Sequence, residues 1–200
     1  MSATYHAPSA LELSSSLHVT LLYDEFCVNV FPTAGRTRSR GPSGCAERKK
    51  KPAKGGEMPE IEFRAVTSAG LKVTTMGLGG TGLGNMYNAI SVDAATATVH
   101  AAYDRGIRYF DTAPVYGFGL SETRLGQAIK SLPRKEIVIS SKVGYDLVPI
   151  PVEQLKPTLW KDPPAIRADF DYSRDAVMRS IEGSLKRLGT DYIDMLAIHD

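Results

Sequence analysis

The sequence has few cysteines, no long apolar run and almost no net charge. Cys27 and Cys45 are its only cysteines, too few for a disulfide framework and not spaced as metal ligands, so we expect no metal site. No apolar run approaches the ~18 residues of a membrane-spanning helix. The 24 Lys and Arg residues nearly balance the 22 Asp and Glu residues, which leaves a formal net charge of +2. These absences exclude a disulfide-rich scaffold and predict no membrane and no nucleic acid among the partners.

Charge is unevenly distributed along the 200 residues. Residues 36–54 contain eight basic residues and one acid, interleaved with Gly, Pro and Ser, a composition typical of a solvated segment. We predict a disordered basic extension over residues 1–57 and a folded domain over residues 58–200. The basic run at residues 48–51 has an alternative interpretation as a nuclear address or an anion-binding tail. Residues 17–31 lack the flanks of a secretory signal, so we expect a cytoplasmic protein.

Strands and helices alternate after Met58. A turn ending in Gly70 predicts a β-hairpin over residues 63–74, and Asp93, Ser121 and Ser173 are predicted helix N-caps. Further strands are predicted at residues 76–79, 107–110, 137–140 and 192–198. Consecutive βαβ units indicate an α/β protein with a parallel sheet, either a closed barrel or a doubly wound sheet. In both architectures the chemistry lies beyond the carboxyl ends of the strands.

Three successive strands carry proton-handling groups at those ends. The strand at residues 107–110 is followed by Asp111 and Tyr116, the strand at 137–140 runs into Lys142, and the last strand ends at His199. A lysine ammonium lowers the pKa of a neighbouring phenol, which brings Tyr116 into the range for proton transfer. Such a set protonates a carbonyl during hydride delivery. Because none of these groups donates a hydride, a nicotinamide cofactor is implied.

These residues lie in motifs that resemble the aldo-keto reductase family. The motifs are GIRYFDTAPVYG at 106–117, SSKVG at 140–144 and LGTDYIDMLAIH at 188–199. The resemblance covers about residues 62–200 and implies a (β/α)8 TIM barrel. It also implies the site roles, in which Tyr116 is the general acid and base, Lys142 lowers the pKa of Tyr116, Asp111 pairs with Lys142, and His199 positions the substrate carbonyl.

A narrower similarity points to the D-threo-aldose 1-dehydrogenase branch, which includes L-fucose and L-galactose dehydrogenases. It rests on GGTGLGN at 79–85, YGFGLSE at 116–122 and FDYSRDAVMRSIE at 170–182. The resemblance implies oxidation of a small-molecule sugar to a lactone with NADP or NAD, and it places Gly80 and Thr81 near the nicotinamide. A pyridoxal 4-dehydrogenase and a general aldehyde reductase are the alternatives within this family.

Two features have competing interpretations. GLGGTG at residues 77–82 fits the G-x-G-x-x-G pattern of a Rossmann phosphate loop, but a Rossmann loop runs straight into a helix and about ten residues intervene here. We therefore interpret it as the exit from a barrel strand. Trp160 lies in a Pro-rich insert at residues 148–164, where either a substrate-lining role or surface packing of a long loop fits the sequence.

The length conflicts with a whole barrel. A (β/α)8 barrel typically needs ~250 residues, whereas the predicted elements end after the fourth barrel strand, at His199. The sequence thus predicts a barrel truncated after its fourth strand, with a disordered N-terminal extension. An alternative function follows, that of a catalytically inactive half-barrel, which would self-associate through its exposed edge.

Overall fold

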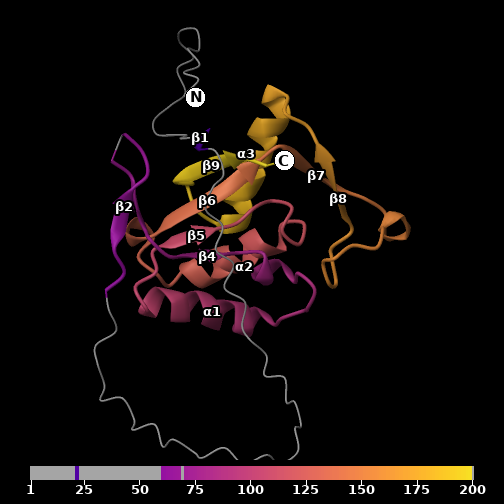
Figure 1. Ribbon diagram of the computed structural model, residues 1–200. Helices are drawn as coiled ribbons and strands as arrows, with labels where there is room; N and C mark the ends of the chain where they lie inside the picture. Colours follow the sequence, from indigo (N-terminus) through magenta and orange to yellow (C-terminus); the bar gives the residue numbers. More distant parts are fainter. Residues whose placement is uncertain (1–20, 23–59, 69, 200) are drawn as a thin grey trace, which may run out of the picture.

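The computed structural model of the protein describes residues 21–22, 60–68 and 70–199. Its main sheet has the strand order β1-β9-β6-β5-β4, and every neighbouring pair in it is parallel (Figure 1). The strands of this sheet are β1 (Leu21–Leu22), β4 (Gly77–Gly79), β5 (Tyr109–Asp111), β6 (Val138–Val143) and β9 (Met195–Ile198). The prediction of a parallel α/β sheet is therefore confirmed, with β6 extending further than the sequence indicates.

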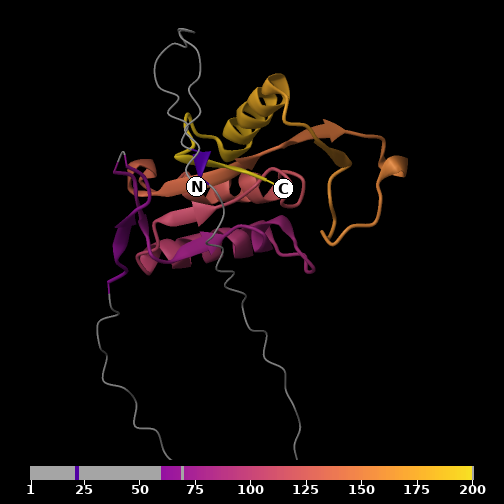
Figure 2. The same ribbon diagram turned by 45° about the horizontal axis from the view of Figure 1, so that its top comes forward.

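Helices cover one face of this sheet (Figures 1 and 2). They are α1 (Val92–Asp104), α2 (Leu120–Ile129) and α3 (Arg174–Leu188), and α2 packs between the other two. The core between helices and sheet includes Phe110 of β5, Leu125 of α2 and Leu188 of α3, each at most 1% exposed. Burying each of these side chains contributes about 1.5–3 kcal/mol, so the sheet and helix layer form one packed unit.

Two hairpins lie at opposite ends of the sheet (Figure 1). The predicted one joins β2 (Phe63–Ala65) to β3 (Lys72–Thr74) and pairs Phe63 with Thr74. Its Val73 packs against Val138 and Met195, and so closes the end at which the parallel strands begin. The other joins β7 (Tyr145–Pro149) to β8 (Ile166–Phe170) and continues directly from β6, at the carboxyl end.

The β7–β8 hairpin is not predicted from the sequence, and it takes the first two residues, 148 and 149, of the predicted long loop at 148–164. Tyr145 pairs with Phe170, and Pro149 pairs with Ile166 at the far end of the ladder. The prolines hide these strands from sequence analysis, because proline is depleted in strands. The polar residues Asp146, Arg167 and Asp169 further weaken the apolar pattern.

Two of the three predicted helix caps are wrong. Ser91, not Asp93, caps α1, since its hydroxyl accepts a hydrogen bond from the Ala94 N–H (3.1 Å). Gly119 occupies the cap position of α2, and the buried Ser121 instead donates its hydroxyl to the Gly80 carbonyl (2.7 Å). A long-range hydrogen bond to Gly80 thus replaces the capping role that the local sequence predicts for Ser121. The third prediction is confirmed, because Ser173 accepts from the Ala176 N–H (3.3 Å).

The predicted domain division falls mostly outside the described residues. Within the segment 1–57 the structure describes Leu21–Leu22, which pair as β1 with Leu196 and Ala197 of β9. This is the sheet edge that the sequence analysis expects to be exposed, and β1 lies on it. The disorder of the remaining residues of 1–57 stays a prediction. Within the described ranges, no helix is long and apolar enough to cross a membrane.

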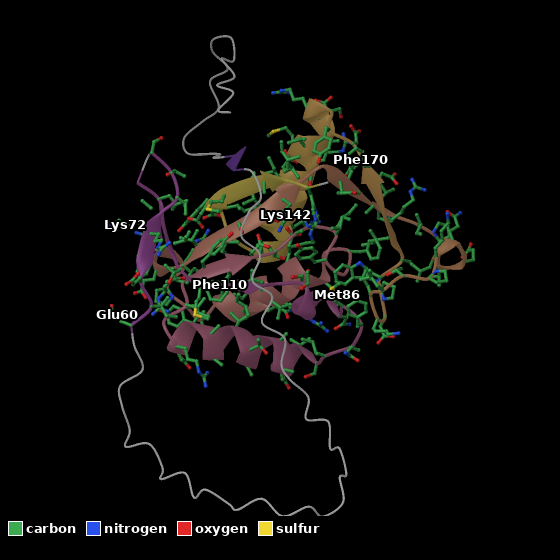
Figure 3. All side chains as sticks on the ribbon, in the orientation of Figure 1. Glu60, Lys72, Met86, Phe110, Lys142 and Phe170 are labelled. Atoms are coloured by element: carbon green, nitrogen blue, oxygen red, sulfur yellow. The ribbon has the colours of Figure 1, made fainter. Side chains whose placement is uncertain are left out.

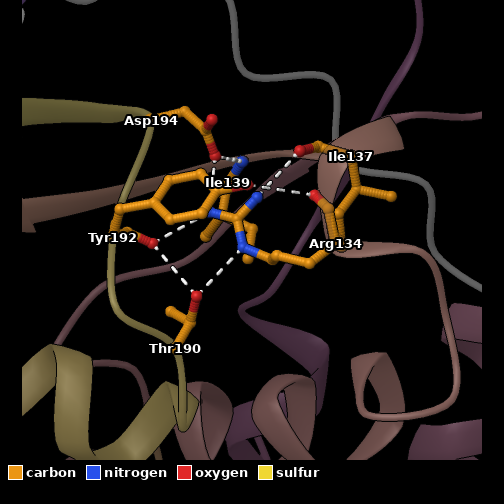
Figure 4. Close-up of polar contacts among 6 residues, drawn as sticks. All are labelled: Arg134, Ile137, Ile139, Thr190, Tyr192 and Asp194. Atoms are coloured by element: carbon orange, nitrogen blue, oxygen red, sulfur yellow. Dashed lines mark hydrogen bonds and ion pairs between the residues drawn. The ribbon is translucent and has the colours of Figure 1, made fainter.

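Arg134 joins the start of β6 to the loop before β9 (Figure 4). Its guanidinium donates to the Ile137 carbonyl (2.9 Å), to Thr190 Oγ1 (3.1 Å) and to the Tyr192 carbonyl (2.9 Å). It also forms an ion pair with Asp194 (2.7 Å), whose carboxylate accepts from the Ile139 N–H (2.9 Å). Because the Arg134 and Asp194 side chains are only 19% and 16% exposed, solvent screens the pair weakly.

We expect Arg134→Lys to lower the free energy of unfolding by about 2 kcal/mol, because an ammonium cannot reproduce the planar fork of donors. Urea unfolding followed by circular dichroism measures the change. Arg105→Lys is the matched control, since Arg105 donates one exposed hydrogen bond to the Ala101 carbonyl. Equal unfolding midpoints for the two variants would contradict a structural role for Arg134.

Candidate active site

The predicted site residues meet at the carboxyl ends of the strands. Asp111 ends β5, Lys142 lies in β6 and His199 follows β9. The parallel register sets Asp111 beside Ser140 and Lys142 beside Ala197. Side chains of residues i and i+2 in a strand share a face, so Ser140 and Lys142 both face Asp111. The structure thus brings strand residues far apart in sequence to one rim, and Figure 3 labels one of them, Lys142.

Lys142 is a buried cation with a defined partner. It is 3% exposed, and its Nζ donates to Asp111 Oδ2 (2.7 Å) and to the Thr112 carbonyl (3.2 Å). Burial on its own lowers the pKa of Lys142, but the charge of Asp111, the charge of Tyr116 and hydrogen bonds with both raise it, and the net direction is upward. The ammonium therefore stays charged at neutral pH although water is excluded from it.

Tyr116 lies on the loop between β5 and α2. Its N–H donates to the Ala113 carbonyl (3.1 Å), and its own carbonyl accepts from the Ser121 N–H (3.1 Å). The centroid of its ring lies 5.0 Å from Lys142 Nζ, and 5.8 Å from the centroid of the His199 ring, which is oriented edge-on. All four residues predicted for catalysis, Asp111, Tyr116, Lys142 and His199, are thus brought together; their catalytic roles stay predictions.

Ser140 and Tyr109 are site residues that sequence reasoning missed. The Ser140 hydroxyl lies 2.5 Å from Asp111 Oδ1 and 3.0 Å from the Tyr109 hydroxyl. A carboxylate only accepts hydrogen bonds, so the single hydroxyl proton of Ser140 is donated to Asp111. In the second hydrogen bond, the Tyr109 hydroxyl therefore donates to the Ser140 oxygen. Both oxygens of Asp111 are therefore occupied, one by Ser140 and one by Lys142. The position of Ser140 two residues before Lys142 in a strand was the available signal.

The glycine-rich loop after β4 is shaped by close packing. A Cβ on Gly80 would lie 2.6 Å from Ser121 Oγ, and one on Gly84 would lie 2.7 Å from the carbonyl carbon of Tyr116. The Gly80 N–H donates to the Asp111 carbonyl (2.7 Å), so the loop is tied to the end of β5. Since α1 begins only at Val92, the geometry is not that of a Rossmann loop. A cofactor contact by Gly80 and the half-buried Thr81 stays a prediction.

Trp160 comes from the insert between β7 and β8. Its ring centroid lies 6.0 Å from that of Tyr116, with the two planes tilted by 40°. Tyr145 of β7 lies on the other side of the site, 5.7 Å from the His199 ring. The structure thus places Trp160 beside Tyr116, and a substrate-lining role for Trp160 stays a prediction. In the described residues, no group of three or more His, Cys, Asp and Glu side chains could hold a metal ion.

The chain is similar to enzymes of one family over most of its described length. A model of the aldo/keto reductase family matches residues 75–200. D-threo-aldose 1-dehydrogenase of Pseudomonas sp is 43% identical over 141 residues, 68% of this chain and 43% of the relative. Pyridoxal 4-dehydrogenase of Microbacterium luteolum is 42% identical over 148 residues, 70% and 43%. L-galactose dehydrogenase of Arabidopsis thaliana is 37% identical over 145 residues, 72% and 39%.

A solved structure supports the fold. The holo form of an aldo-keto reductase from Bacillus halodurans matches with a TM-score of 0.54 and 28% identity, covering 70% of this chain and 40% of that one. The resemblance to the aldo-keto reductases and their (β/α)8 fold, inferred from the sequence motifs, is confirmed by these matches. The chain spans 43% of the length of the Pseudomonas and Microbacterium relatives.

The raised pKa of Lys142 makes stability depend on pH in one direction. A cation whose pKa is higher in the folded state stabilises the fold fully below its unfolded value of about 10.4, and this contribution is lost as pH rises through the folded value. We expect the unfolding free energy of the unmodified chain to fall more steeply above about pH 10 than that of Lys142→Met. Denaturant titrations at a series of alkaline pH values measure both slopes.

The exposed Lys156 provides the control for this measurement. Lys156→Met should follow the pH profile of the unmodified chain, because it makes the same substitution at an exposed position outside the site. Parallel profiles for Lys142→Met and the unmodified chain would show that the Asp111 pair does not bias the Lys142 proton.

Proposed function

The chain belongs to the aldo/keto reductase family of oxidoreductases, and we propose that its site interconverts an aldose and the corresponding lactone with a nicotinamide coenzyme. The observation that carries the proposal is the buried ammonium of Lys142, paired with Asp111 at 2.7 Å and 5.0 Å from the centroid of the Tyr116 ring. A fixed positive charge beside a phenol favours its phenolate form. Tyr116 is then the group that exchanges the proton.

Sugar oxidation divides the work among the four residues. Tyr116 takes the proton of the anomeric hydroxyl as the carbon–oxygen double bond forms, and it returns that proton in the reverse direction. Lys142 stabilises the phenolate, while Asp111 holds the ammonium in place. The His199 ring, edge-on to Tyr116, donates a hydrogen bond to the reacting oxygen.

The four side chains do not include a hydride acceptor, because carboxylate, phenol, ammonium and imidazole do not accept a hydride. When bound, NADP or NAD supplies the acceptor for the hydride that leaves the anomeric carbon with the electron pair of its C–H bond. Thr81, half-buried beside the end of β5, is the side chain proposed to contact the nicotinamide, together with the backbone of Gly80.

Pyridoxal is a second candidate substrate. The relative named pyridoxal 4-dehydrogenase is 42% identical, nearly as similar as the aldose dehydrogenase at 43%. Pyridoxal also carries its reactive carbon on a six-membered ring, and the same proton transfer by Tyr116 would serve its oxidation. The two substrates therefore share the catalytic residues and differ in the ring that the site receives.

We expect reduction of NAD or NADP by L-galactose or L-fucose, followed at 340 nm, and a fall in rate of about 10²- to 10⁴-fold in Tyr116→Phe. The variant keeps the ring and removes the group that exchanges the proton. Tyr145→Phe is the matched control, because it removes a phenol hydroxyl from a ring that lies 5.7 Å from the His199 ring and to which the proposal gives no part in proton transfer. Its rate should stay within a few-fold of the unmodified chain.

The outcomes separate the two functions considered from the sequence. Turnover that survives Tyr116→Phe contradicts the role of Tyr116. Absence of turnover with both coenzymes and with L-galactose, L-fucose and pyridoxal contradicts activity in these 200 residues and favours the inactive half-barrel.

A further inference from the structure

The segment that carries Trp160 is fastened to the glycine-rich loop on both sides of the indole. The Leu159 carbonyl accepts from the Tyr87 N–H (3.0 Å), and the Lys161 N–H donates to the Asn85 carbonyl (2.9 Å). The side-chain amide of Asn85 also donates to the Lys161 carbonyl (3.1 Å), and Met86 and Trp160 form an antiparallel bridge. The backbone on either side of Trp160 is therefore fixed against the loop that follows β4.

This fastening is local to residues 159–161. The insert is otherwise exposed over most of its length, with Val152 at 73%. If the segment only covered the surface, hydrogen bonds concentrated on either side of one large side chain would not be expected. The geometry instead holds the half-buried indole at one place, 6.0 Å from the Tyr116 ring.

The anchor continues into the core through Asn85. This residue is 4% exposed and adopts a left-handed backbone conformation (φ 67°). Its Oδ1 accepts from Arg124 Nη1 (2.6 Å), and the same guanidinium donates to the Leu83 carbonyl (2.7 Å) and the Ile90 carbonyl (2.8 Å). Arg124 is itself 7% exposed, on α2. Trp160 is thus positioned by a buried side-chain network and not by the insert alone.

We propose that Trp160 contacts the substrate, with its indole packed against the apolar C–H face of the pyranose ring whose anomeric carbon is oxidised. The proposal rests on the proposed function and adds to it the recognition of the ring. A pyranose presents C–H groups on its faces and hydroxyls at its edge, so an aromatic plane binds its face while polar groups bind its rim. Tyr116 and His199 supply those polar groups beside Trp160.

The same arrangement explains selection between ring and open-chain substrates. A small aldehyde or an open-chain polyol needs the Tyr116 proton equally but offers no ring face to the indole. Ligand sites combine an aromatic or apolar wall with a few placed polar groups, and the wall discriminates by shape. Trp160 therefore favours cyclic sugars without taking part in proton transfer.

Intrinsic fluorescence tests this directly, because Trp160 is the only tryptophan of the chain. We expect L-galactose to change the Trp160 emission in a saturable manner in the full-length chain, without coenzyme and without turnover. Mannitol, an open-chain polyol, should not do so. An emission that no sugar alters at any concentration up to the solubility limit would overturn the proposal. A response to pyridoxine but not to L-galactose would overturn the pyranose assignment.

Saturation-transfer NMR tests the contact in variants that lack the fluorophore. The C–H protons of one pyranose face should receive the largest transfer from the unmodified chain. Trp160→Ala should weaken L-galactose binding roughly ten-fold, while Trp160→Phe, which keeps an aromatic plane, should restore most of it. Leu159→Ala is the matched control, since it removes an exposed apolar side chain (45%) from the same segment and keeps the backbone bonds. Equal binding by Trp160→Ala and Leu159→Ala would overturn the proposal.

These measurements fail separately from the proposed function. Tyr116→Phe should lower turnover by about 10²- to 10⁴-fold and still show a saturable sugar-dependent change in Trp160 emission, shifted to higher sugar concentration by the loss of one hydroxyl. Trp160→Ala should raise KM for L-galactose by a larger factor than it lowers kcat. Sugar binding without turnover would contradict the proposed activity and support the role of Trp160. Turnover with an emission that sugar does not change would support the activity and contradict the role of Trp160.

Discussion

A buried ammonium on β6 is the constraint on which the arrangement of the site depends. At 3% exposure, Lys142 can remain charged only if its partners are supplied by the protein. Asp111 and the Thr112 carbonyl provide them from the neighbouring strand, and Ser140 occupies the second oxygen of Asp111. Removing one member of such a pair leaves an uncompensated charge, which typically costs about 3–5 kcal/mol. The register of β5 and β6 and the charge state of the site are therefore coupled.

Much of the site could be predicted because parallel strands impose its location. Asp111, Lys142 and His199 lie at or beside strand ends in the sequence, and the fold requires those ends to share one rim. Sequence reasoning misses Ser140 and leaves Trp160 with two interpretations, because the place of each depends on contacts across the sheet and between distant loops. Ser121 shows the same limit in the helices, since its long-range bond to Gly80 displaces the local capping role.

The glycine-rich loop shows why a motif needs its structural context. Its spacing fits a phosphate-binding pattern, yet Gly80 and Gly84 are required because Ser121 and the Tyr116 backbone occupy the space of a Cβ. The loop also anchors the Trp160 segment through Asn85. One stretch of chain therefore supports the residue proposed for proton transfer and the residue proposed for ring recognition.

The two proposed tasks depend on different parts of the molecule. The proposed proton transfer rests on strands β5 and β6, where the Lys142–Asp111 pair is shielded from solvent, whereas the proposed ring recognition rests on an insert that is exposed over most of its length. The Trp160 segment is held by hydrogen bonds from the loop after β4, which Arg124 supports through Asn85. Lys142 is held by different groups, so a substitution in the insert can change the position of the indole without changing the charge on Lys142. Substrate preference can therefore change while the acid–base chemistry is retained, a separation consistent with aldose and pyridoxal dehydrogenases of nearly equal similarity to this chain.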